Sequence, residues 1–466
     1  MPPQNNSTTK YVIAIVIILI MIGVGVYILV GRGTSSTGTG KDQTAPPVFV
    51  PLNRNKTTGA NKATGANTAS TTTNGNNFQT AIPVLRLLSN DPVGGYGAST
   101  TASTTIVRWV NRGRGNVYET KADSLDITTI SNTVVPRIYD SIWNKTLTSF
   151  VGSTLSSGSA NATTIFASLT SRVVPKPAGT ATTSKPVTTT TTATTSKTTT
   201  ATTTAPTTLT LETSSVVGAV QTPYELKGKN LPSNIVTYAL SPKSDRIFMV
   251  TNESGHGIGY VATVDGKTLT QIFDTPLTQI VAEWPEDNTI AITTKASSAE
   301  IGYMYFVSPK TGVWSKVLGP TMGLTTKVSH DAKYVLASTG GPDSVSTKIY
   351  TVSTGKSIDA IIRTIADKCV WGNFNKSMFY CAVPNQATSA AYPDDWYKGI
   401  ISFADKIWQV NASTGEVHLV TSIVDLSDRV IDAFNLGLDT KDEYLYFMNK
   451  NDLSLWSFDL VNSKVQ

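Results

Sequence analysis

The stretch YALSPKSDRIFMV at residues 238–250 returns three times, in altered form, along the second half of the chain. The later copies read VAEWPEDNTIAI at 281–292, TKVSHDAKYVLA at 326–337 and VWGNFNKSMFYC at 370–381. Each copy is a short apolar strand, a polar turn and a second strand rich in β-branched or aromatic residues. A repeat of about 43 residues that is made only of strands predicts the blades of a β-propeller.

The strand pattern extends over residues 82–460 and predicts an all-β, seven-bladed propeller with four strands, a to d, in each blade. Three strands expected at 430–439, 443–450 and 453–460 lack a fourth, whereas 83–89 is an unpartnered strand at the other end. If 83–89 serves as strand d of the last blade, the ring closes and two open sheet edges disappear. One misread blade would give six or eight blades instead, so these counts stay open.

Two insertions interrupt the repeat. Val173–Thr208 is a low-complexity tract rich in Thr, typical of an extended stalk that can carry O-linked glycans. Asn385–Ala404 lengthens a later blade between its strands b and c. Because neighbouring strands are antiparallel, a b–c insertion and a c–d insertion must lie on opposite faces of the ring. We therefore expect the two insertions to point in opposite directions.

The N-terminus predicts a membrane anchor. After a short tail at residues 1–10, Tyr11–Val30 is a run of twenty uncharged residues, long enough to cross a bilayer as a helix. A cleaved signal peptide is the alternative, but this run exceeds the usual apolar region and no Ala-x-Ala-like site follows it. Residues 31–81 are rich in Thr, Asn and Gly, and we expect a disordered tether there.

The expected orientation is a single-pass membrane protein whose propeller is extracytoplasmic, at the cell surface or in the periplasm. The flanking positive charges barely decide it, since Lys10 precedes the apolar run and Arg32 and Lys41 follow it. The short N-terminal tail and the Thr-rich tracts favour export of the bulk of the chain. The membrane is thus one expected partner.

The two cysteines lie symmetrically about the middle of an apparent hairpin. Cys369 and Cys381 flank Asn375, and directly opposed residues of an antiparallel pair are close enough for a disulfide. Two unrelated buried thiols are the alternative. A disulfide would indicate an oxidising compartment.

Composition argues against several classes of partner. The net charge of +6 is small for 466 residues and no basic run is long enough to follow a phosphate backbone, so nucleic acid is not expected. Arg108, Arg112 and Arg114 are interpreted as a solvated face of one blade. Only three histidines are present and no metalloprotease, nucleophile-elbow, phosphate-loop or EF-hand motif occurs, so we predict no catalytic residues, no metal site and no cofactor.

The insertion at 385–404 holds the one candidate binding motif, Pro393-Asp394-Asp395-Trp396-Tyr397. Exposed Trp and Tyr are good binding anchors, so Asp394, Asp395, Trp396 and Tyr397 are the ligand-binding candidates. In the alternative interpretation, Trp396 and Tyr397 fold back to fix their own loop and the aspartates are turn residues. Two adjacent carboxylates alone supply too few ligands for a hard cation.

The Ser-Pro-x-x-x-x-Ile-Phe pattern at Ser241–Phe248 resembles the WD40-like (PD40) blades of TolB-type and dipeptidyl-peptidase-type propellers. The arrangement as a whole also resembles uncharacterised membrane-anchored propeller proteins of bacteria. These degenerate motifs imply a fold and not an activity. We expect no hydrolase activity from the resemblance, because no peptidase domain follows the predicted propeller.

The leading hypothesis is a non-enzymatic binding or scaffold module that binds a protein or an envelope glycan with its outward face. One alternative is a propeller-type hydrolase with its site at the central channel. Three or more acids or histidines that converge at the channel mouth would favour that enzyme. Another alternative is a passive envelope spacer.

Overall fold

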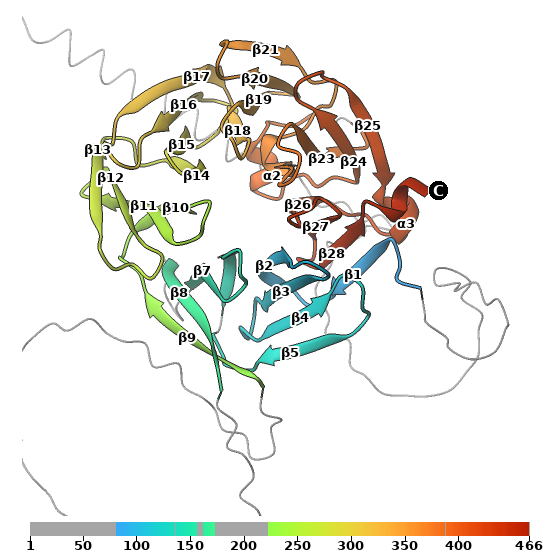
Figure 1. Cartoon of the computed structure of the whole chain (residues 1–466). Helices are drawn as coiled ribbons and strands as arrows, with labels where there is room; N and C mark the ends of the chain where they lie inside the picture. Colours follow the sequence, from blue (N-terminus) through green and yellow to red (C-terminus); the bar gives the residue numbers. More distant parts are fainter. Residues whose placement is uncertain (1–80, 136, 156–161, 173–221, 387, 466) are drawn as a thin grey trace, which may run out of the picture. The chain divides into compact units, whose positions relative to one another are not determined.

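The computed structural model describes residues 81–466 except 136, 156–161, 173–221, 387 and 466. Within these residues the chain forms seven four-stranded antiparallel sheets arranged as a ring (Figure 1), which confirms the predicted all-β, seven-bladed propeller. The expected tail, membrane helix and tether at 1–80, and the Thr-rich tract at 173–208, lie outside the described residues. None of the helices described here is long and apolar enough to span a bilayer.

The first three blades use the strands before and just after the Thr-rich tract. Blade 1 is β2 (Val93–Thr100), β3 (Thr105–Asn111), β4 (Val117–Lys121) and β5 (Ile127–Ser131). Blade 2 is β6 (Ile138–Trp143), β7 (Ser149–Leu155), β8 (Ala162–Ser171) and β9 (Tyr224–Asn230). Blade 3 is β10 (Ile235–Leu240), β11 (Arg246–Glu253), β12 (His256–Thr263) and β13 (Thr270–Thr275).

The remaining blades complete the ring. Blade 4 is β14 (Ile280–Glu286), β15 (Thr289–Thr294), β16 (Ile301–Val307) and β17 (Trp314–Met322). Blade 5 is β18 (Thr325–Val328), β19 (Tyr334–Gly341), β20 (Ser344–Thr351) and β21 (Lys356–Asp359). Blade 6 is β22 (Cys369–Trp371), β23 (Met378–Pro384), β24 (Asp405–Asn411) and β25 (Val417–Ser422). Blade 7 is β26 (Ala433–Leu438), β27 (Tyr444–Asn449), β28 (Leu455–Asp459) and β1 (Leu85–Ser89).

The helices of the described residues are short and lie outside the blades, in connections or at the end of the chain. These are η1 (Ala366–Lys368) before blade 6, α2 (Asp394–Tyr397) in the insertion, α3 (Ile423–Ser427) after β25, and η2 (Asn462–Val465) at the end of the described chain.

Closure of the ring depends on the strand that precedes the first blade. β1 pairs with β28, and Leu85 and Leu87 stand opposite Phe458 and Trp456. Leu88 on the same strand is buried with the blade 1 residue Val107. The predicted closing role of 83–89 is confirmed, and it joins the two ends of the propeller through main-chain hydrogen bonds.

The core lies between the blades. Strand b is packed on both sides by neighbouring sheets, so in blades such as 3 and 7 it carries a continuous apolar run instead of an alternating one. In β11 the residues Ile247 to Val250 are all fully buried, as are Leu445 to Phe447 in β27. The same run of apolar residues in the repeated sequence therefore reflects two-sided burial.

The disulfide joins strands a and b of blade 6. Cys369 stands opposite Cys381 in the β22–β23 register, with a Cα–Cα distance of 4.1 Å. The predicted pairing is confirmed.

The ring has two distinct faces. The b–c loops and the d–a connections share one, which carries α2 and the 385–404 insertion and is called the insertion face here. The a–b and c–d turns share the other, called the hairpin face, where the exposed Phe374 lies between β22 and β23. β1 starts on the hairpin face, and the β8–β9 connection leaves from it, as the strand alternation predicts.

Removal of β1 tests how much closure contributes. A variant that lacks residues 1–89 exposes the edge of β28 and the apolar surface of Trp456 and Phe458, so we expect a midpoint of thermal unfolding at least about 10 °C lower, or aggregation. A variant that lacks only 1–80 keeps β1 and is the matched control. Equal midpoints for the two variants would contradict a closing role for β1.

Candidate functional site

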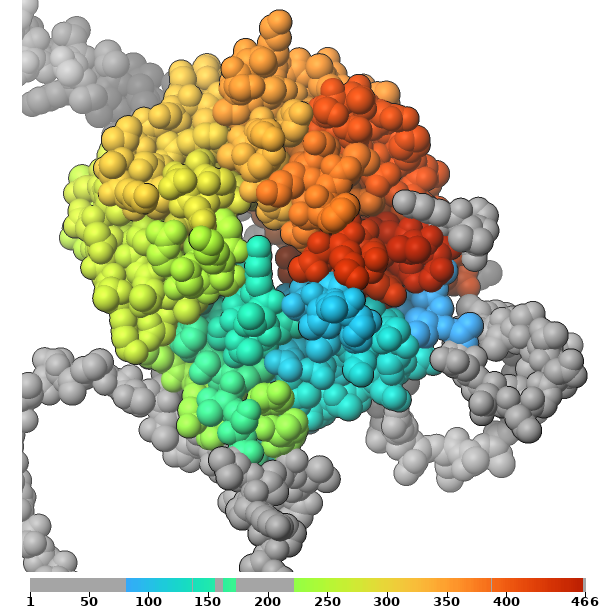
Figure 2. Space-filling model, in the orientation of Figure 1, coloured from blue at the N-terminus to red at the C-terminus, as the bar shows by residue number. Residues whose placement is uncertain are grey.

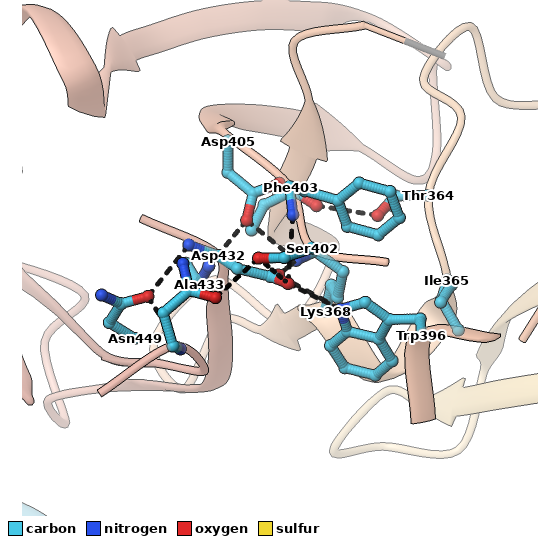
Figure 3. Close-up of polar contacts among 12 residues, drawn as sticks. Thr364, Ile365, Lys368, Trp396, Ser402, Phe403, Asp405, Asp432, Ala433 and Asn449 are labelled. Atoms are coloured by element: carbon cyan, nitrogen blue, oxygen red, sulfur yellow. Dashed lines mark hydrogen bonds and ion pairs between the residues drawn. The ribbon is translucent and has the colours of Figure 1, made fainter. Parts of the chain in front are cut away.

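A lysine without solvent contact joins blades 6 and 7 on the insertion face (Figure 3). Lys368, the last residue of η1, directs its Nζ to Asp405 Oδ2 at 2.8 Å and to Asp432 Oδ1. All three side chains are 0% exposed. Asp405 begins β24 and Asp432 directly precedes β26, so one ammonium holds three chain segments together. We call these three residues the buried ion cluster.

Groups of the protein itself donate hydrogen bonds to both oxygens of the Asp432 carboxylate. Besides Lys368, its carboxylate accepts the Trp396 indole N–H at 3.0 Å, the Ser402 hydroxyl at 3.2 Å and the Phe403 amide at 3.2 Å. The last three donors belong to the 385–404 insertion. The insertion is therefore tied to the start of blade 7.

Asp405 is less well compensated. Its Oδ2 accepts the Ala433 amide at 2.6 Å as well as Lys368, but its Oδ1 is buried without a partner in the described part of the chain. Burial raises the pKa of Asp405 to about 6, although the Lys368 ammonium lowers it, and the nearby Asp432 charge raises it further. The cluster holds two carboxylates and only one lysine. Asp405 is the carboxylate whose ionised form is disfavoured by this excess of negative charge.

Two ammonium groups lie close to the ring of Trp396. Its ring is 5.1 Å from Lys368 Nζ and 5.2 Å from Lys450 Nζ, and the residue is only 4% exposed. The insertion also forms its own small core, in which Trp396 packs with Tyr392 and Phe403. For Trp396 the structure agrees with the fold-back interpretation, because the side chain fixes its own loop and is not an exposed anchor.

The other three candidate residues have different surroundings. Asp395 Oδ2 accepts the Ala391 amide at 2.9 Å and Asp394 Oδ2 accepts the Ser298 amide at 2.5 Å, so both carboxylates hold backbone in place. Tyr397 is 41% exposed, and its hydroxyl donates to Asp367. The four side chains thus do not converge on one point, and Tyr397 is the candidate that presents a ring to solvent.

The axis of the ring is an open channel, visible as the hollow in Figure 2. Its cavity of about 900 Å³ is lined by the inner strands of several blades together with Trp396 and Tyr397 of the insertion. Acidic, basic and histidine residues line it from blades 1, 2, 4, 5 and 7 and from the connection before blade 6. They are Arg112, Asp140, Glu283, Lys327, His330, Asp367 and Lys450.

The channel acids have partners inside the protein. Glu283 pairs with Lys327 at 2.8 Å, and this carboxylate raises the pKa of Lys327. Asp140 accepts the Tyr238 hydroxyl at 3.1 Å. Asp367 lines the channel and accepts a hydrogen bond from the Tyr397 hydroxyl. Enclosure by the channel walls raises its pKa.

The sequence pattern did not indicate the buried ion cluster, and the interpretation as a solvated face is wrong for Arg108 and Arg112. Lys368, Asp405 and Asp432 are far apart in the sequence, and only the fold brings them together. Arg108 is not on a solvated face, since it is 9% exposed and pairs with Glu119 at 2.7 Å. Arg112 lines the channel, and Arg114 is exposed as expected. Within the described residues no three His, Cys, Asp or Glu side chains gather in a way that could hold a metal ion.

Comparison with protein-family models gives no match, and comparison with curated proteins gives none either. Solved structures similar to this chain include TolB from Acinetobacter baumannii, with 8% identity, a TM-score of 0.36, and coverage of 75% of this chain and 60% of that one. An oligogalacturonate lyase in complex with manganese has 10% identity, a TM-score of 0.43 and coverage of 80% and 98%. A puromycin-hydrolyzing peptidase of Mycobacterium tuberculosis has 12% identity, a TM-score of 0.40 and coverage of 76% and 50%.

At these identities the likeness concerns the fold alone. The resemblance to WD40-like propellers of the TolB type is confirmed at that level, and the seven sheets of the structure itself carry the assignment. The similar structures include named enzymes as well as TolB, so they leave the activity of this chain open.

The buried ion cluster makes stability depend on pH in a specific direction. The pKa of Asp405 is about 6 in the folded state and near the ordinary value of 3.8 in the unfolded chain, so the folded state binds the extra proton between these values. Its contribution to the free energy of unfolding is therefore lost as the pH rises through about 6. We expect Asp405→Asn to match the native protein at pH 4 and to be more stable, by about 1–2 kcal/mol, at pH 7.5.

Asp432→Asn is the matched comparison for this experiment. An amide cannot accept from all the donors that point at Asp432, so we expect this variant to be less stable by about 2–4 kcal/mol at both pH values. Chemical denaturation at the two pH values measures both effects. A pH slope unchanged in Asp405→Asn would contradict the assignment of the raised pKa.

Proposed function

We propose that the chain is a non-enzymatic binding or scaffold module that binds a protein or envelope-glycan ligand with its insertion face. In this proposal residues 11–30 anchor it to a membrane and the propeller is extracytoplasmic. The observation that carries the proposal is how the insertion in blade 6 is held. Its buried Trp396 donates to Asp432, which is part of the buried ion cluster.

A fixed loop with apolar groups at its surface is suited to binding, because little entropy is lost when the ligand orders it. Tyr397 is 41% exposed and Ile400 is 66% exposed, and both follow the buried Trp396 within four residues. Tyr397 also borders the channel. The insertion therefore presents apolar side chains beside a hollow, on a support that does not have to rearrange.

Two observations support the proposed location. The Cys369–Cys381 disulfide is typical of an oxidising compartment. β1 starts on the hairpin face, whereas the insertion lies on the opposite face. The preceding chain therefore enters the propeller on the face opposite the insertion, which leaves the insertion face free to bind a ligand in this proposal.

A hydrolase with its site in the channel is the second candidate. Asp140, Glu283, Asp367 and His330 all line the same channel, as a catalytic site there would require. The raised pKa of Asp367 is also a property of catalytic acids. Against this candidate, each of the three carboxylates already accepts a hydrogen bond from a neighbouring side chain, as Asp140 does from Tyr238.

The experiment that tests the binding module alters only the exposed side chains of the insertion. In Tyr397→Ala with Ile400→Ser, Trp396 and its bonds to Asp432 remain, so the loop keeps its support. We expect crosslinking and pull-down from the cell envelope to lose a specific partner, with an unfolding midpoint within a few degrees of the native protein.

Phe374→Ser is the matched control, because Phe374 is 79% exposed but lies on the hairpin face. Loss of the same partner in the control, or an unchanged partner in the insertion variant, would contradict the proposed recognition face. An unchanged set of partners in both variants would favour the envelope spacer. Turnover of a glycan or phosphoester that is lost in Asp367→Asn would favour the hydrolase.

A further inference from the structure

Blades 1 and 7, which are neighbours in the ring, place a cation at the same structural position. The backbone N–H that follows strand b donates to the carbonyl just before strand a of the same blade, from Arg112 to Pro92 at 2.9 Å and from Lys450 to Asp432 at 2.8 Å. This bond fixes both residues at the insertion-face end of their blades. Both side chains line the channel.

The donors of these two side chains are mostly unused. Arg112 Nη1 donates to the Tyr139 carbonyl at 2.8 Å, and its other N–H groups have no bond to the described residues. Lys450 Nζ makes neither a hydrogen bond nor an ion pair within the residues that the structure describes. Its near contact is the face of the Trp396 ring at 5.2 Å.

Both cations are partly removed from water without a counter-ion in contact. Burial lowers the pKa of Lys450 and that of Arg112, although Asp432 and Asp140 respectively raise them. These acids are not free to move closer. Asp432 is held by Lys368 and the insertion, and Asp140 by Tyr238 and the Ser153 amide.

The remaining surface at this end of the channel is largely apolar. Phe434, Met448, Leu453 and Trp396 line it together with the two cations. Free donors beside apolar walls match a ligand that has an oxyanion and a compact apolar or ring body, because charge-assisted hydrogen bonds are strong where water is excluded.

We propose that the insertion-face mouth of the channel, at blades 7 and 1, binds the carboxylate or phosphate group of a small acidic ligand, with Lys450 and Arg112 as the donors. This site lies inside the channel and is separate from the exposed side chains of the insertion. It does not depend on the partner that the insertion face binds.

The test uses two probes at constant ionic strength, inorganic phosphate and sodium glucuronate. Each is added to the full-length protein. Isothermal titration calorimetry and the unfolding midpoint measure binding. We expect the native protein to bind one of the two probes. Binding of phosphate would indicate recognition of a phosphate group, and binding of glucuronate would indicate recognition of a carboxylate. Arg112→Gln and Lys450→Gln should each weaken binding about tenfold, and the double variant should abolish it.

Lys295→Gln is the matched control. Lys295 has the equivalent position in blade 4, where its N–H donates to the Gln279 carbonyl at 2.9 Å, but its side chain is exposed and does not line the channel. We expect it to bind like the native protein. Binding of neither probe, or an equal loss in Lys295→Gln, would overturn the proposal.

Lys450→Gln also distinguishes a binding role from a structural one. Because the ammonium is partly buried without a counter-ion, its removal should leave the unfolding midpoint unchanged or higher in the absence of ligand. A lower midpoint in this variant would mean that Lys450 stabilises the fold, and would overturn its assignment as an unused donor.

Discussion

The insertion face depends on one buried ammonium. Lys368 joins the connection before blade 6, strand c of that blade and the connection to blade 7, through carboxylates that are as buried as it is. A buried ion pair contributes little net stability compared with apolar packing, but it penalises every arrangement that leaves one of its charges unpaired. We infer that its main effect is specificity. It fixes how two neighbouring blades meet and where the insertion rests on them.

The Asp432 carboxylate, which links blades 6 and 7, also accepts hydrogen bonds from the insertion. Asp432 accepts from Lys368 and from three donors of the 385–404 loop, so the position of the loop and the junction of blades 6 and 7 are coupled. Trp396 strengthens the coupling, since its indole N–H donates to Asp432 and its ring lies 5.1 Å from the Lys368 ammonium. A loop held in this way can present Tyr397 and Ile400 at its surface without collapsing onto the channel.

The fold could be predicted because its determinants are local and repeated. Apolar runs that mark strand b, turns at a constant interval and an unpartnered strand at 83–89 were enough to give seven blades and their closure. The disulfide followed from two cysteines placed symmetrically about one turn.

The site could not be predicted in the same way. Lys368, Asp405 and Asp432 each look like an ordinary charged residue beside a strand, and their contact arises only from the packing of two blades. Trp396 showed the limit most clearly, since an aromatic residue in a long loop is equally consistent with an exposed anchor and with an internal support.

A propeller repeats its backbone but not its side chains, and this contrast locates the chemistry. A main-chain bond from a residue at the end of strand b to the carbonyl just before strand a recurs in blades 1, 2, 3, 4 and 7, where the donating residues are Arg112, Leu155, Asn252, Lys295 and Lys450. The repeated bond joins main-chain atoms, so it does not depend on the side chain. The residue at this position can therefore differ between blades. Where two neighbouring blades both place a cation there and leave most of its donors without a partner among the described residues, stability of the fold does not require that choice. Partly buried cations without counter-ions carry a cost in folding free energy, and a ligand that supplies the missing anion is the simplest physical reason for a chain to keep them.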